Sequence, residues 1–129
     1  MNGRFLLDSN IVIALFSGEQ SVLDKIQESA ELYLPAIVIG ELYYGAFNSS
    51  RQQTNLDRID QFKSQISILD CDEYTAKYYG QIKKGLKNKG TPIPENDIWI
   101  AALALQYDLT IVMRDAHFNQ IENLKPETW

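Results

Sequence analysis

The chain has 129 residues, of which 45% are hydrophobic and 22% are charged, and its net charge at pH 7 is −5. This length and composition are typical of a globular protein whose core is large enough to be stable without disulfide bonds, so we expect a single domain over residues 1–129. One cysteine, Cys71, excludes an internal disulfide, and one histidine, His117, is too few for a zinc site of the cysteine and histidine type.

The longest apolar stretch, residues 5–16, is interrupted by Asp8, Ser9 and Asn10 and is shorter than the roughly 20 residues of a spanning helix. The amino terminus has no basic region followed by an apolar run, so we expect a cytoplasmic protein without a membrane partner. The acidic charge argues against a partner bound by simple positive charge. Two bound divalent cations would bring the charge from −5 to −1, however, so nucleic acid is not excluded.

Short apolar runs alternate with segments of helical spacing. In chain order the pattern predicts a strand over 4–8, helices over 11–16 and 21–30, a strand over 32–34, helices over 35–47 and about 56–66, a strand over 66–69, a helix over 72–88, a loop over 90–94, a helix from 96, a strand over 109–113, a short helix through 118–121 and a terminal segment over 124–129. This alternation predicts an α/β fold, a three-layer α/β/α sandwich with a mainly parallel sheet.

Polar and glycine residues mark the expected ends of several helices. Ser9 or Asn10 is a suitable cap for the first helix, and Gly18 is expected to end it. Residues 21–24 have the spacing of a capping box, and Asn96 is expected to cap a later helix. In folds of this class, ligands bind beyond the carboxyl ends of the strands.

Four acidic residues lie where the surrounding sequence predicts burial: Asp8, Glu41, Asp97 and Asp115. Burying an unpaired carboxylate is costly, so each needs a partner. Glu41 is the only charged residue between Glu31 and Arg51, so no basic partner is close to it in sequence. Together the four carboxylates indicate one shared site for a hard cation such as Mg²⁺ or Mn²⁺, which prefers oxygen ligands.

Each acid also has a simpler explanation when it is taken alone. For Asp97 it is the electrostatic preference for a helix amino terminus, for Asp8 and Asp115 it is a turn, and for Glu41 it is an internal salt bridge. His117 is expected to pack or cap, because no G-x-S-x-G segment is present to complete a catalytic triad.

A run of basic residues leads to Asp97, since residues 74–94 contain no acid and have lysines at 77, 83, 84, 87 and 89. They form either a solvated helix face or, through Lys83, Lys84, Lys87 and Lys89, an RNA-binding rim. Tyrosines 74, 78 and 79 are expected to mark the packed face of this helix. Base stacking and core packing are both open for Tyr43, Tyr44, Tyr78, Tyr79 and Trp99.

Four segments together resemble the PIN-domain ribonucleases, specifically the VapC-type toxins of bacterial toxin-antitoxin pairs. They are Phe5-Leu-Leu-Asp-Ser-Asn10, Pro35-Ala-Ile-Val-Ile-Gly-Glu-Leu-Tyr-Tyr-Gly45, Asn96-Asp-Ile-Trp-Ile-Ala-Ala102, and Arg114-Asp-Ala-His-Phe118 followed by Ile121 and Leu124. The resemblance covers nearly the whole chain. It implies that Asp8, Glu41, Asp97 and Asp115 are catalytic and bind Mg²⁺ or Mn²⁺, supported by Ser9 and Asn10. Ser9 stands where the family commonly carries Thr.

The resemblance further implies that a metal-activated water hydrolyses RNA phosphodiester bonds to a 5′-phosphate and a 3′-hydroxyl. It also implies a homodimer and a cognate antitoxin that covers the active-site groove. Candidate residues for these protein contacts are Tyr43, Tyr44 and Phe47, because aromatic residues are enriched at interfaces.

Two other functions stay open. Another carboxylate- and magnesium-dependent phosphohydrolase, such as a haloacid-dehalogenase enzyme, would need a second aspartate in the Asp8-Ser-Asn10 loop. A non-catalytic module with an acidic pocket, such as a receiver domain, would need an acceptor aspartate after a middle strand, for which Asp70 is the one candidate.

Overall fold

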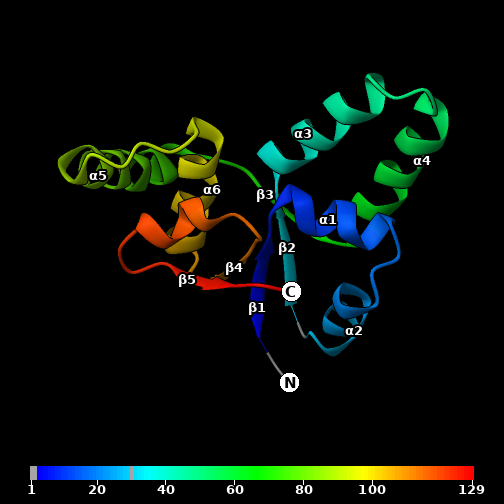
Figure 1. Cartoon of the computed structure of the whole chain (residues 1–129), viewed down its shortest axis with the longest axis horizontal. Coiled ribbons are helices and arrows are strands. Elements are labelled where there is room, and N and C mark those ends of the chain that lie inside the picture. The colour runs from blue at the N-terminus through cyan, green and yellow to red at the C-terminus, as the bar shows by residue number, and fades with distance from the viewer. Residues whose placement is uncertain (1–2, 30) are drawn as a thin grey trace.

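A five-stranded, wholly parallel β-sheet with helices on both faces forms the framework of the computed structural model, which describes residues 3–29 and 31–129 (Figure 1). The three-layer prediction is therefore confirmed, with a sheet that is parallel throughout. The elements are β1 (Arg4–Leu7), α1 (Ser9–Phe16), α2 (Gln20–Glu28), β2 (Glu31–Pro35), α3 (Ala36–Phe47), α4 (Gln52–Lys63), β3 (Ser67–Leu69), α5 (Glu73–Lys89), α6 (Glu95–Gln106), β4 (Thr110–Val112), the 3₁₀ helix η1 (Ala116–Gln120) and β5 (Lys125–Glu127).

The order of the strands, β3-β2-β1-β4-β5, creates a switch point between β1 and β4. From β1 the chain builds the sheet outward in one direction through β2 and β3, and it then returns to add β4 and β5 on the other side. The backbone amide of Asp8 donates to the carbonyl oxygen of Val112 at 3.0 Å, which joins the carboxyl ends of the two central strands. Parallel α/β sheets bind their ligands at such a point.

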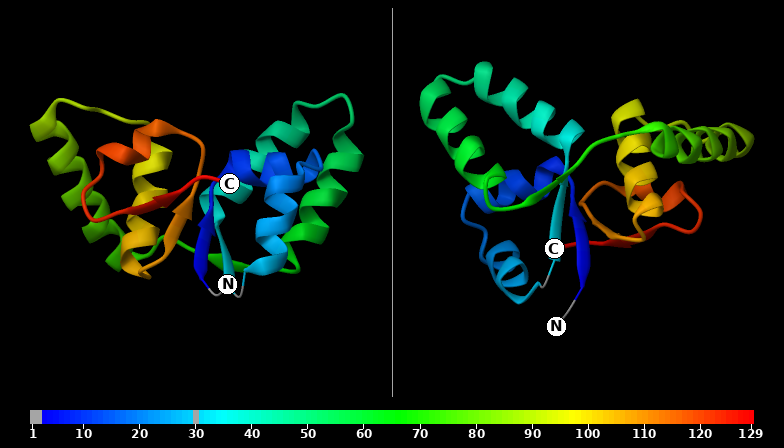
Figure 2. Two further views of the ribbon diagram at one scale, coloured as in Figure 1. Left: turned by 60° about the horizontal axis from the view of Figure 1, so that its bottom comes forward. Right: turned by 180° about the vertical axis from the view of Figure 1, so that it is seen from behind.

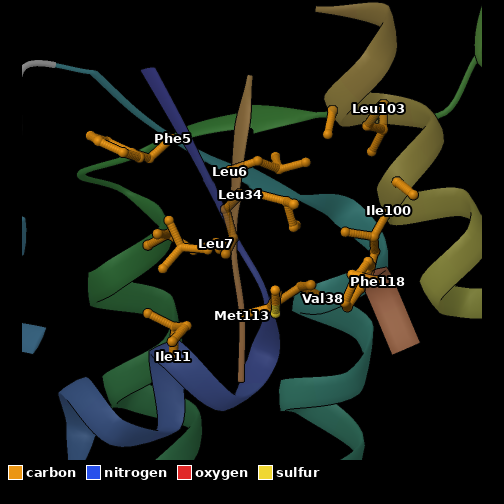
Figure 3. Close-up of a cluster of buried hydrophobic side chains, with 14 of the residues drawn as sticks. Phe5, Leu6, Leu7, Ile11, Leu34, Val38, Ile100, Leu103, Met113 and Phe118 are labelled. Atoms are coloured by element: carbon orange, nitrogen blue, oxygen red, sulfur yellow. The ribbon is translucent and has the colours of Figure 1, made fainter. Parts of the chain in front are cut away.

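Helices cover the two faces of the sheet in separate groups, with α5, α6 and η1 on one face and α1 to α4 on the other (Figures 1 and 2). Leu6 and Leu7 are fully buried because successive strand residues point to opposite faces and both faces are covered. Figure 3 shows Leu6 on the side of α6, which carries Leu103 and Ile100, and Leu7 on the side of Ile11 in α1. The apolar run of β1 is thus shared between two layers of core.

Three expected helix caps are wrong. Helix α1 starts at Ser9, with Asp8 at the N-cap position, and α6 starts at Glu95, so Asn96 lies inside its first turn. Residues 21–24 form no capping box, because α2 already starts at Gln20, with Glu19 at its N-cap position after Gly18 turns the chain with a φ of +77°. Gly18 does end the first helical segment, as expected.

The packed face of α5 also differs from the prediction. Tyr78 and Tyr79 are half-buried, but Tyr74 is 66% exposed, because the fully buried position of that first turn is Thr75. No helix within residues 3–29 and 31–129 is long and apolar enough to cross a membrane.

Candidate metal centre

All four predicted acidic residues line one open pocket of about 460 Å³ at the switch point of the sheet. Asp8 directly follows β1, Asp115 comes shortly after β4, Asp97 lies in the first turn of α6, and Glu41 lies near the middle of α3. The pocket is completed by Ser9, Asn10, Pro94, Glu95 and Asn96. Four segments that are distant in sequence therefore bring their carboxylates together.

The local backbone leaves the carboxylate of Asp8 available to the pocket. Asp8 has the extended conformation of an N-cap residue, but its side chain makes no capping hydrogen bond to α1. Asp97 needs no cap role either, since the N-cap position of α6 is occupied by Pro94. Neither carboxylate acts as the side-chain cap of the helix beside it.

Burial and mutual repulsion make the charged form of these acids costly. Burial, together with the charges of Asp97, Glu41 and Asp115, raises the pKa of Asp8 to about 6, against a backbone hydrogen bond from Ser9. The pKa of Glu41 is raised by burial and by Asp97, against the side chains of Asn96 and Ser9. Burial and the charge of Asp115 also raise the pKa of Asp97, against a contact with His117.

The four acids have no lysine or arginine partner among the described residues. Within residues 3–29 and 31–129, no lysine or arginine forms an ion pair with any of them, so the simpler explanation of Glu41 as half of an internal salt bridge is wrong. Among the described residues, the buried oxygens Oε1 of Glu41 and Oδ1 of Asn10 have no hydrogen-bond partner. A divalent cation supplies the charge and the partner that these oxygens lack, so the residues present fit such an ion.

The structure places the two predicted supporting residues, Ser9 and Asn10, in the lining of the pocket. It adds Asn96, which sequence reasoning had treated only as a helix cap. Asp115 has a second role that matches its simpler explanation, since its Oδ1 accepts a hydrogen bond from the backbone amide of His117 at 2.9 Å and caps η1.

His117 contacts the acidic cluster, contrary to the expectation that it packs or caps. Its side chain is 46% exposed, and its ring nitrogen Nδ1 lies 3.1 Å from Oδ1 of Asp115 and 3.4 Å from Oδ2 of Asp97. The sequence could have indicated this contact, because His117 lies two residues after Asp115. A tight turn there brings the His117 side chain back to the carboxylate of Asp115.

The predicted basic rim is divided by ion pairs. Lys83 is paired with Glu95, and Lys89 lies 3.7 Å from Glu122 and donates to the backbone of the same loop. Lys83 and Lys87 line a neighbouring pocket of about 400 Å³ together with Glu95, which also lines the acidic pocket. Lys87 is therefore the lysine of this pocket that carries no ion pair within the described residues.

The aromatic candidates divide between internal and exposed positions. Tyr79 and Trp99 stack on each other with ring centroids 4.2 Å apart, so those faces are not open to bases. The hydroxyl of Tyr43 donates to Asp60. Tyr44 and Phe47 are 72% and 59% exposed on α3. They lie on the helix that, with α1 and α4, encloses an apolar groove of about 260 Å³ reaching Glu41.

Comparison with known proteins gives consistent matches over the whole chain. Residues 5–124 match the PIN domain family. The chain is 34% identical over 129 residues to "Ribonuclease VapC" of Haemophilus influenzae and 32% identical to the "tRNA(fMet)-specific endonuclease VapC" of Shigella flexneri, with 98% of each chain covered in both cases. Its structure is similar to that of DNA-bound VapBC from Salmonella typhimurium, with a TM-score of 0.91, 29% identity and 98% of each chain covered.

The alternative of a receiver-like module loses its support in this fold. Asp70 follows β3, which is an edge strand of the sheet and not a middle strand. It is exposed and does not line the acidic pocket.

Proposed function

Because the chain belongs to the PIN-domain family, we propose that it is a metal-dependent endoribonuclease that acts as the toxin of a toxin-antitoxin pair. The observation that supports this most strongly is the pocket at the switch point, where four carboxylates converge without a lysine or arginine partner among the described residues. Hydrolysis of RNA is also the activity named for the VapC relatives of Haemophilus influenzae and Shigella flexneri.

In this proposal Asp8, Glu41, Asp97 and Asp115 hold Mg²⁺ or Mn²⁺. A cation bound there lowers the pKa of water and stabilises negative charge on the phosphate of the substrate. The chain itself contributes the fixed positions of the carboxylates, because two of them are anchored at the joined ends of β1 and β4. Ser9 and Asn96 lower the pKa of Glu41 and so favour its charged, metal-binding form.

RNA is proposed to enter along the side where Glu95 separates the acidic pocket from the pocket of Lys83 and Lys87. Lys87 would contact a phosphate of the RNA close to the site of cleavage. Lys84 extends the same helix surface, whereas Lys83 would have to leave Glu95 and Lys89 would have to leave Glu122.

The proposed protein partner is an antitoxin that binds over the groove between α1, α3 and α4. This groove is apolar, it reaches Glu41, and Tyr44 and Phe47 are exposed on the same helix. An occupant of the groove would thus lie beside the acidic pocket and block RNA. A homodimer and a cytoplasmic location complete the proposal, following the resemblance to VapC toxins.

The test is controlled expression of the wild-type chain, of Asp8→Asn and of Asp24→Asn in bacteria, followed by growth curves and mapping of RNA 5′ ends. Asp24 lies on the exposed side of α2 and serves as the control for loss of one negative charge. We expect growth arrest and new RNA 5′ ends for the wild type and Asp24→Asn, and neither for Asp8→Asn. Equal arrest by all three chains would refute the proposal.

A further inference from the structure

His117 brings the only imidazole of the chain into contact with two acids of the pocket, Asp97 and Asp115. Donor atoms of Asp97, Asp115 and His117 all lie within 4.8 Å of one another. The ring is directed at the carboxylates by its Nδ1 atom, with distances of 3.1 Å to Asp115 and 3.4 Å to Asp97. Three donor atoms from α6 and η1 thus surround a common point.

These distances match the spacing of ligands around a small divalent ion. An octahedral ion with bonds of about 2.1 Å has neighbouring ligand atoms about 3.0 Å apart. The separations of 3.1 and 3.4 Å between Nδ1 and the two carboxylate oxygens are close to this value. An ion held by Asp97 and Asp115 would therefore lie close to the imidazole nitrogen.

The same distances also suit a hydrogen bond from the imidazole to a carboxylate, and the two arrangements differ in a measurable way. As a ligand, Nδ1 carries no proton and donates an electron pair to the ion, while Nε2 keeps the proton. As a hydrogen-bond donor, Nδ1 carries a proton and cannot touch the ion. Since the ring is 46% exposed, Nε2 can keep its proton in contact with water.

We infer that His117 is a direct ligand of the cation held by Asp97 and Asp115, and that it shifts the selectivity of the site from Mg²⁺ toward Mn²⁺. Mg²⁺ retains its waters and favours oxygen ligands, whereas imidazole binds first-row transition ions more readily. This inference rests on the proposed function, because it assumes that the acidic pocket binds a divalent ion.

The chain offers an unusually clean spectroscopic test, since His117 is its only histidine. Pulsed electron paramagnetic resonance of Mn²⁺ bound to the full, untagged chain without RNA detects the ¹⁴N nucleus of a ligated imidazole. We expect an imidazole ¹⁴N coupling in the wild type and its loss in His117→Gln, whose amide keeps a polar group at the same position. Titration should show about tenfold weaker Mn²⁺ binding in the variant, with Mg²⁺ binding changed by less than about threefold.

The possible failures separate the inference from the proposed function. Mn²⁺ that binds the wild type and is lost in Asp97→Asn, but shows no ¹⁴N coupling, would overturn the role of His117 and leave the proposed metal site standing. Failure of the wild type to bind Mn²⁺ at all would overturn both. Urea unfolding of His117→Gln at the wild-type midpoint would show that the variant is folded, as expected for a half-exposed ring.

Discussion

The backbone amide of Asp8 donates a hydrogen bond to the carbonyl oxygen of Val112 at 3.0 Å, so the ends of the two central strands are held together at the acidic pocket. This bond fixes the start of the loop that carries Asp115 relative to the carboxylate of Asp8. This backbone contact therefore holds the acidic side chains at one end of the sheet. Their mutual repulsion costs stability unless a cation compensates it.

Asp8→Asn should stabilise the ion-free protein at neutral pH. Because the pKa of Asp8 is raised to about 6 in the folded protein, its favourable contribution is fully present below its ordinary pKa of 3.8 and is lost as the pH rises through 6. The difference between these two pKa values corresponds to about 3 kcal/mol in the free energy of unfolding. In urea unfolding with chelator, the free energy of unfolding of Asp8→Asn should rise relative to that of the wild type between about pH 4 and about pH 7. The full rise should be about 3 kcal/mol.

Asp24→Asn is the matched control, because it removes one exposed carboxylate on α2 and should keep the wild-type pH dependence. A wild-type and Asp8→Asn pair whose free energies of unfolding change in parallel with pH would contradict the account of crowded charge.

Divalent cations should stabilise the folded chain in the absence of RNA. An ion that binds only the folded state contributes about 2.7 kcal/mol when its concentration is 100 times its dissociation constant. We expect Mn²⁺ to raise the Tm of the wild type at pH 7.5 and to leave that of Asp97→Asn nearly unchanged. An equal rise in both chains, measured by calorimetry, would mean that the ion binds elsewhere.

Lys87→Glu should weaken RNA binding more than Lys89→Glu. Lys87 lines the pocket that shares Glu95 with the acidic site, whereas Lys89 is engaged with Glu122 on another side of α5. Loss of one phosphate contact lowers the slope of log affinity against log salt by about 0.7 for single-stranded RNA. The measurement is fluorescence anisotropy of a labelled RNA in chelator at several salt concentrations, and identical slopes for both variants would exclude Lys87 from the RNA surface.

Tyr44→Ala should reduce the affinity for the antitoxin without reducing RNA cleavage by the free chain. Tyr44 is 72% exposed, and exposed aromatic residues that become buried at the centre of an interface often contribute about 2 kcal/mol, which is roughly a thirtyfold change in affinity. Calorimetric titration with the antitoxin checks this, and sedimentation of the free chain checks the dimer. If both affinities are unchanged, α3 does not carry the contact.

The main features of fold and site were predictable because both follow from short apolar runs and the polar residues that end them. Phe5, Leu6 and Leu7 predict a strand covered on both faces, and a carboxylate placed directly after such a strand must emerge at the edge where ligands bind. Glu41 was recognisable because its neighbours are apolar and it has no basic partner nearby in sequence.

The remaining features depend on contacts that no local pattern contains. Lys83 pairs with Glu95 only because α5 and α6 pack against each other and bring residues 12 apart together. His117 reaches Asp97, 20 positions earlier in the chain, because η1 lies beside the amino-terminal end of α6. The helix-cap predictions were wrong because a shift of one or two residues in a tight turn changes which side chain occupies the cap position.

The most direct test of the central claim is cleavage of a defined RNA by the purified wild-type chain and by Asp97→Asn, each with Mg²⁺, Mn²⁺ or chelator. We expect the wild type to cut with either ion, to leave 5′-phosphate ends and to be inactive in chelator, while Asp97→Asn is at least about 100-fold slower under all conditions. Cleavage by the wild type in chelator, or at the same rate by Asp97→Asn, would contradict the assignment of the acidic pocket as a metal-dependent active site.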